Sequence, residues 1–163
     1  MNPLIINSLI IKMTIYQDKT GKTWALNIDT NALKRVRRNV KDRNGNSVDL
    51  LYIGNGETIK NILSDPILLT DILWAILEPQ AKTEQISWNA FQAAHAGNVF
   101  VEARRALAEA VGEYFPTLEG LAFREAFRKI LGERDQVTKA VLEEMNRTPQ
   151  ETTETEKSDE SGG

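Results

Sequence analysis

The residue types that most often carry chemistry are sparse in this sequence. It contains no cysteine and a single histidine, His95. Thiolate nucleophiles, disulfides and metal sites built from several histidines are therefore excluded. His95 stands beside alanines near a predicted helix end, and no Ser-His-Asp set or paired carboxylate can be argued around it. We interpret it as a packing or capping residue, and we expect no enzymatic activity, no cofactor and no metal.

Two glycine motifs match nucleotide-binding loops only in part. Gly21-Lys22-Thr23 resembles the end of a P-loop, but Tyr16 stands where that loop requires its first glycine. A strand is also predicted after Thr23, where a P-loop is followed by a helix. Gly54-Asn55-Gly56 lacks the third glycine of a dinucleotide fingerprint. Both motifs are interpreted as turns.

Basic residues are concentrated on one predicted helix. The cluster comprises Lys34, Arg35, Arg37, Arg38 and Lys41, with Arg43 just beyond. Such a cluster can contact phosphates, and that binding would weaken sharply with salt. However, no aromatic residues interleave with these bases for stacking, and the formal net charge of −3 gives no overall attraction to nucleic acid or anionic membranes. We therefore interpret the cluster as a solvated face or a contact for a protein partner.

Aromatic residues provide the other candidate binding groups, because aromatic side chains dominate protein interfaces. The candidates are Trp74, Trp88, Phe91, Tyr114 and Phe115. The alternative is that these residues belong to the core, which is the more common role for such side chains.

The segment from Pro66 to Pro116 is predicted to be helical and tightly packed, with the rest of the chain attached to it. Its first part repeats apolar residues at steps of three and four, and Asp65 before Pro66 is typical of a helix start. Pro79 is predicted to kink this helix or to end it near Leu77. Ser87 should cap a second helix that ends at Gly97-Asn98, and a third should run from about Val99 to Phe115.

The remaining elements can be assigned from local patterns. Apolar and polar residues alternate in 12–18 and again in 23–28, on either side of a glycine-containing loop, which predicts a β-hairpin. Depending on register, one buried face would carry Met13 and Ile15, or Tyr16 in addition. The partner strand would contribute Trp24, Leu26 and Ile28. Helices are expected at about 30–41 and 57–63. A last helix, capped by Thr117, has its apolar stripe at Leu121, Phe123, Phe127, Ile130, Leu131, Val137, Val141 and Met145, with Gly132 as a potential interruption. The predicted fold is mainly α, with a small N-terminal β-hairpin packed on a helical domain.

Domain organisation follows from the same patterns. Residues 1–12 are interpreted as a flexible extension or as residues upstream of a true start at Met13, and residues 13–146 as the folded domain. Residues 147–163 have no large apolar side chain and an excess of acids, which predicts a disordered acidic tail. No stretch is long and apolar enough to cross a membrane, so a cytoplasmic protein is expected.

The run Leu73-Trp74-Ala75-Ile76-Leu77-Glu78-Pro79-Gln80-Ala81-Lys82 resembles the tail assembly chaperones of long-tailed bacteriophages. Those proteins have a similar leucine-tryptophan and proline-glutamine-alanine pattern after an aspartate-proline helix start, here Asp65-Pro66. An aromatic helix entry follows, here Phe91, and then an alanine-rich helix with an aromatic-aromatic-proline end, here Tyr114-Phe115-Pro116. Lys22-Thr23-Trp24, Lys34-Arg35-Val36-Arg37 and Val48-Asp49-Leu50-Leu51 extend the resemblance, which covers roughly Met13 to Leu131.

The resemblance implies a non-enzymatic role in virion assembly. Such chaperones bind the tape measure protein, keep its hydrophobic helices from aggregating, and promote assembly of the tail tube around it. The tail tube protein and a second copy of the chain are further partners to consider, in the cytoplasm of a bacterial host. The alternatives are a virion structural protein, such as a tail or connector subunit, and, less favoured, a nucleic-acid-binding regulator.

Overall fold

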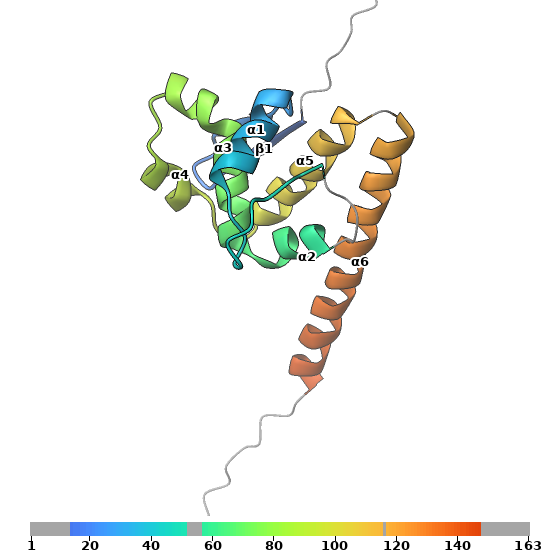
Figure 1. Cartoon of the computed structure of the whole chain (residues 1–163). Helices are drawn as coiled ribbons and strands as arrows, with labels where there is room; N and C mark the ends of the chain where they lie inside the picture. Colours follow the sequence, from blue (N-terminus) through green and yellow to red (C-terminus); the bar gives the residue numbers. More distant parts are fainter. Residues whose placement is uncertain (1–13, 52–56, 116, 148–163) are drawn as a thin grey trace, which may run out of the picture. The chain divides into compact units, whose positions relative to one another are not determined.

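The computed structural model describes residues 14–51, 57–115 and 117–147 (Figure 1). The chain is mainly α-helical, with an N-terminal β-hairpin packed on the helices, as the sequence predicts. It divides into two compact units, Met1–Ile130 and Leu131–Gly163, and the boundary falls inside the last helix. The proposed extension at 1–12 and the acidic tail after Arg147 lie outside the described residues.

The hairpin pairs β1 (Thr14–Gln17) with β2 (Thr23–Leu26) in antiparallel register, with Tyr16 opposite Trp24. Gly21 has a φ of 81°, which a glycine adopts without steric cost, so the turn forms where the sequence predicts it. The buried face carries Tyr16, Trp24 and Leu26. The assignment of Ile15 to this face was wrong: it is 56% exposed, because side chains alternate along a strand and Tyr16 takes the inward position. Met13 lies outside the described residues.

Two short helices follow the hairpin. Helix α1 (Thr30–Asn39) begins at Asp29, whose side chain accepts a hydrogen bond from the Ala32 amide at 2.7 Å. Its apolar stripe is buried as predicted, with Val36 fully enclosed and Val40 just after the helix end. Helix α2 (Glu57–Ser64) matches the predicted short helix.

Helix α3 (Pro66–Thr83) is the central element and contacts β2, α1, α2, α4 and α5. Asp65 caps it, accepting from the amides of Ile67 at 3.0 Å and Leu68 at 3.2 Å. The apolar stripe of the sequence forms the core: Leu68, Leu69, Ile72, Leu73, Ile76 and Leu77 are all buried. Of the two outcomes predicted for Pro79, a kink or a helix end near Leu77, the helix end is wrong, since α3 continues through Pro79 to Thr83.

Helices α4 (Trp88–Ala94) and α5 (Val99–Tyr114) complete the core. Ser87 caps α4 as predicted, accepting from the Ala90 amide at 3.1 Å. Helix α4 ends at Ala94 with His95 as its C-cap, two residues before the predicted cap at Gly97-Asn98, and Gly97 has a positive φ of 61° in the connection to α5. The buried alanines of α5 allow close packing, and α5 lies against both β1 and α3.

Helix α6 (Thr117–Arg147) is continuous, so Gly132 does not interrupt it. The N-terminal part of α6 belongs to the first unit. Its residues Phe123 and Phe127 are buried there. In this region α6 lies close to α5. A methyl group added at Gly120 of α6 would overlap the carbonyl oxygen of Gly112 of α5. Arg147, assigned to the tail from the sequence, is the last residue of the helix.

Candidate partner-binding surfaces

Arg35, the central residue of the basic cluster, has an internal structural role. Its Nε donates to the carbonyl oxygen of Ala75 at 2.7 Å, and its Nη2 donates to that of Ile76 at 3.1 Å. Pro79 has no N–H to offer the carbonyl four residues before it, which is that of Ala75. The guanidinium therefore supplies the donor that proline removes, and this explains how α3 continues through Pro79.

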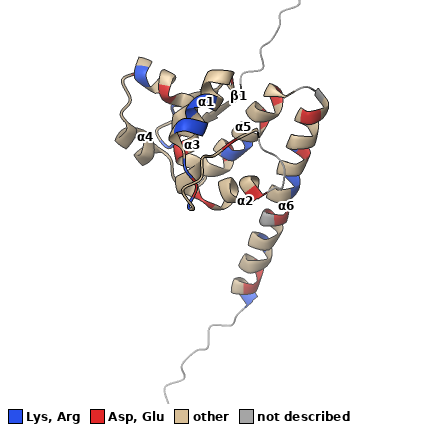
Figure 2. Ribbon diagram, viewed as in Figure 1, with Lys and Arg blue, Asp and Glu red and all other residues tan. Residues whose placement is uncertain are grey.

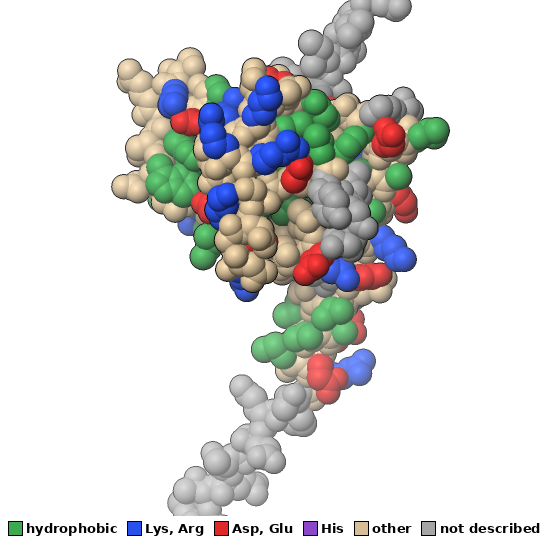
Figure 3. Space-filling model, viewed as in Figure 1, with side chains coloured by type: hydrophobic (Ala, Val, Ile, Leu, Met, Phe, Trp, Pro, Cys, Tyr) green, Lys and Arg blue, Asp and Glu red, His purple; other side chains and the backbone are tan. Residues whose placement is uncertain are grey.

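The other basic residues form an exposed face along α1 and just after it (Figures 2 and 3). Arg37 pairs with Asp49 at 2.7 Å, Arg38 donates to the side chain of Asn39, and Lys41 donates to Ser47. Lys34 is exposed on the same helix. In the predicted basic contact face, Arg35 is thus bonded to backbone carbonyls of α3. Three other residues, Arg37, Arg38 and Lys41, bond to nearby polar side chains.

Three of the predicted anchor residues form one aromatic cluster. The ring centroid of Trp74 lies 5.2 Å from that of Trp88 and 5.2 Å from that of Phe91, and the rings of Trp88 and Phe91 are stacked. Phe91 is fully buried and also packs edge-on against Trp24. Trp74 and Trp88 are only partly buried. Phe91 is therefore a core residue, whereas the two tryptophans present part of their rings to the surface.

A buried polar network next to this cluster gives His95 its role. Its Nδ1 lies 2.7 Å from the carbonyl oxygen of Phe91, which can only accept, so Nδ1 carries the proton. Nε2 then accepts from the Tyr16 hydroxyl at 2.7 Å. Burial lowers the pKa of His95, and the Phe91 bond and the charge of Asp18 oppose this only in part. Burial, followed by the charge of Asp18, raises the pKa of Tyr16. The pair is thus neutral and joins the hairpin to α4, as the interpretation of His95 as a packing residue requires.

Asp18 anchors the hairpin loop on the same side of the core. Its carboxylate accepts from Trp24 Nε1 at 2.9 Å and from the hydroxyl and amide of Thr20. Burial favours a raised pKa for Asp18, but these hydrogen bonds outweigh it and lower the pKa. Sequence reasoning missed this residue, although an aspartate two residues before a threonine in a tight loop is a known turn signal.

The other two predicted anchors lie at the end of α5. Tyr114 is 38% exposed, and its hydroxyl lies 3.3 Å from that of Thr30. Phe115 is partly buried, with its ring centroid 6.0 Å from that of Phe123. The two pairs of anchors, Trp74 with Trp88 and Tyr114 with Phe115, belong to separate aromatic groups, and no ring contact joins them among the described residues.

Most of the large exposed apolar side chains lie on α6, outside the segment from Pro66 to Pro116. The exposed residues of this helix are Leu118, Leu121, Val137, Val141, Leu142 and Met145. Hydrophobic side chains gather on the C-terminal half of α6 in Figure 3. By contrast, the apolar stripe of α3 is internal, and between Pro66 and Ala110, within the described range 57–115, the exposed large apolar side chains are Ile67 and Val101. Surface suited to a partner is therefore concentrated on α6.

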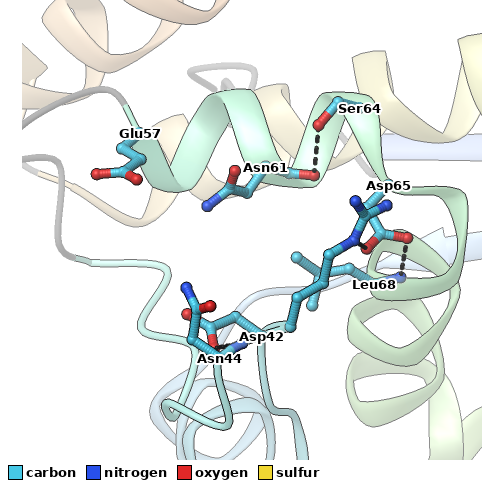
Figure 4. Close-up of a pocket in the computed structure, with 8 residues that line it drawn as sticks. Asp42, Asn44, Glu57, Asn61, Ser64, Asp65 and Leu68 are labelled. Atoms are coloured by element: carbon cyan, nitrogen blue, oxygen red, sulfur yellow. Dashed lines mark hydrogen bonds and ion pairs between the residues drawn. The ribbon is translucent and has the colours of Figure 1, made fainter.

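A polar pocket of about 180 Å³ lies beside the start of α3 (Figure 4). Asp42 and Asn44 face Glu57 and Asn61 across it. Its carboxylates already have partners: Asp42 accepts from the amides of Asn44 and Asn46, and Asp65 caps α3 and accepts from Arg43 at 2.8 Å. Burial favours a raised pKa for Asp65, but the Arg43 and amide bonds lower it. These groups stabilise the turn and the helix start.

Comparison with known proteins returned no matching family model, curated protein or solved structure. Within residues 14–51, 57–115 and 117–147, no group of histidine and carboxylate side chains is arranged to hold a metal ion. None of the helices in that part of the chain has the length and apolar character needed to span a bilayer.

Proposed function

We propose that the protein is a tail assembly chaperone of a long-tailed bacteriophage or prophage, which binds the tape measure protein and promotes assembly of the tail tube. It acts in the host cytoplasm by contact alone, without catalysis. The observation that carries the proposal is the set of exposed apolar side chains on the C-terminal part of α6, Val137, Val141 and Met145. Large exposed apolar patches on soluble proteins mark interaction sites.

The sequence resemblance supports the same function from a separate direction. Its most distinctive run, residues 73–82, lies in the central helix α3, where Trp74 is partly exposed beside Trp88. A tape measure protein is an elongated helical client, and an amphipathic helix can bind another helix through a shared apolar seam.

Co-expression tests the proposal directly. The protein is produced together with the tape measure protein of the same phage or prophage, and the soluble fraction is purified through a tag on the protein. We expect the tape measure protein to be soluble only in the co-expression and to co-purify, whereas an unrelated coiled-coil protein of similar length does not. A tape measure protein that is soluble alone and does not co-purify would contradict the proposal.

Purified virions separate this function from a structural one. A chaperone is absent from finished particles, whereas a tail or connector subunit is retained in them. A nucleic-acid-binding regulator is disfavoured because Arg35 is bonded to α3 and Arg37 is paired with Asp49.

A further inference from the structure

A second cavity, open to solvent and about 200 Å³ in volume, is lined by residues from the first half of α3, from α4 with its C-cap, and from the start of α5. All of them belong to the first compact unit. Its apolar lining residues are Pro66, Ile67 and Phe100, and Ile67 is 75% exposed. We call this cavity the α3–α4 pocket.

The polar residues that line the α3–α4 pocket differ in whether they are free to bind a ligand. The hydroxyl of Thr70 donates to a backbone carbonyl of the preceding turn at 2.7 Å. Both ring nitrogens of His95 are bonded inside the protein, one of them to Tyr16. The side chains of Asp71 and Gln92 form no hydrogen bond within residues 14–51, 57–115 and 117–147. Their oxygens are therefore the acceptors that the pocket offers.

The carboxylate of Asp71 is partly buried and has no counter-charge. It makes no ion pair with the described residues, and burial, followed by the charge of Asp65, raises its pKa. Basic residues of the adjoining segments have other partners: Arg43 pairs with Asp65 at 2.8 Å, and Arg105 pairs with Glu102 at 3.0 Å. A partly buried charge without a partner is unfavourable, so a cation in the pocket would relieve a cost that the free protein bears.

One further basic residue lies near the pocket wall. The guanidinium carbon of Arg104 is 6.0 Å from the ring centroid of Phe100, and the side chain is buried. The neighbouring charge that acts on the pKa of Asp71 is that of Asp65 and not that of Arg104. Arg104 therefore does not neutralise Asp71.

The two partly exposed tryptophans adjoin the α3–α4 pocket. Asp71 and Trp74 are three positions apart on α3, and Trp88 and Gln92 are four positions apart on α4. Residues at these spacings are neighbours on one face of a helix. Because the rings of Trp74 and Trp88 are in contact with each other, the pocket and the tryptophan pair are parts of one surface.

We propose that the α3–α4 pocket receives an arginine side chain of a protein partner. The guanidinium group carries several N–H donors in a planar fork, so it can bond to the carboxylate of Asp71 and to the amide oxygen of Gln92 together. The methylene groups of the arginine contact Pro66 and Ile67, and the ring of Phe100 provides an aromatic surface for the cation. This inference goes beyond the proposed function and does not depend on it.

The test follows the isotope-labelled full chain by NMR while a small arginine compound, N-acetyl-arginine methylamide, is added. The control ligand is N-acetyl-citrulline methylamide, which has nearly the same shape but no charge. The signals to follow are the indole N–H groups of Trp74 and Trp88 and the side-chain amide of Gln92. We expect the arginine compound to bind with a millimolar Kd and at least about fivefold more tightly than the citrulline compound. N-acetyl-lysine methylamide should bind with intermediate affinity, because its ammonium group lacks the fork.

Matched variants locate the binding site. Asp71→Asn keeps the size of the side chain and should weaken binding of the arginine compound by about fivefold, to the level of the citrulline compound. Asp135→Asn makes the same change at an exposed position of α6 and should leave binding unchanged. Lys19 has its amide bonded to the carbonyl of Ala94, next to the pocket residue His95, and Lys19→Gln should also leave binding unchanged. Circular dichroism of each variant verifies that the helix content is maintained.

Equal affinity for the arginine and citrulline compounds, or no shift of these signals at millimolar ligand, would overturn the inference. So would undiminished binding by the Asp71→Asn variant. Tighter binding by the Lys19→Gln variant would show that the chain's own lysine fills the pocket, which also overturns it. Failure of this test leaves the co-expression experiment with the tape measure protein unaffected, and failure of that experiment leaves the arginine pocket unaffected.

Discussion

Replacing Arg35 tests whether the guanidinium is what allows α3 to pass through Pro79. Arg35→Met keeps most of the aliphatic bulk but removes the hydrogen bonds to the carbonyls of Ala75 and Ile76, at 2.7 and 3.1 Å. Hydrogen bonds from charged groups contribute about 1.5–3 kcal/mol each. Because Arg35 is partly exposed and water can replace some of this, we expect a loss of about 2 kcal/mol in the free energy of unfolding. Urea unfolding followed by circular dichroism measures it.

A double-mutant cycle separates this mechanism from a general loss of packing. Pro79→Ala restores an N–H four residues after Ala75, so the carbonyl no longer depends on Arg35. Arg35→Met should then cost about 1 kcal/mol less in the Pro79→Ala background than in the wild type. Equal costs in both backgrounds would refute the reasoning. Arg38→Met is the matched control, since Arg38 is exposed and bonds only to the side chain of Asn39 among the described contacts; its cost should stay within about 0.5 kcal/mol.

The remaining predictions concern the glycines of α6 and the buried histidine. Gly120→Ala should lower the free energy of unfolding by about 2 kcal/mol, because its methyl group would overlap the carbonyl of Gly112. Gly132→Ala has open space around it and should raise the free energy of unfolding by up to about 1 kcal/mol. Urea titration of both variants measures the difference. Tyr16→Phe should cost about 1–2 kcal/mol, since Nε2 of His95 loses its buried donor, and thermal unfolding measures the loss. The lowered pKa of His95 means that the unfolded chain binds its proton first as the pH falls below 6.5, so stability should decline from that pH downward. His95→Gln should remove that part of the pH dependence, and unchanged curves would contradict the assignment.

Local signals in the sequence predicted most helix starts correctly. Asp65 and Ser87 cap α3 and α4 as expected, because a cap depends on a side-chain acceptor and an amide only two or three residues away. The hairpin turn was predicted for the same reason, since Gly21 needs nothing beyond its own backbone freedom. Features decided within one turn of chain are therefore accessible from the sequence.

The errors arise where a distant residue decides the outcome. Pro79 does not end α3 because Arg35 lies 40 positions from Ala75 in sequence and donates to its carbonyl. The inward face of β1 carries Tyr16, whose hydroxyl bonds to His95, 79 positions away in the sequence. Alternation alone allowed either Ile15 or Tyr16 to be buried. Neither of these long-range hydrogen bonds can be predicted from the local spacing of apolar residues.

The contrast between α3 and α6 changes which part of the chain can carry the proposed function. The high apolar content of α3 reflects burial within the protein, since Leu69, Ile72 and Leu73 have no exposed surface. Those residues are already covered and cannot shelter a client. The more polar helix α6 is the one that leaves Val137 and Met145 more than half exposed. The buried residues of the run that resembles the chaperone family therefore account for the fold, and a helical client would have to be held on exposed surface, such as the C-terminal part of α6 or, within that run, the partly exposed Trp74.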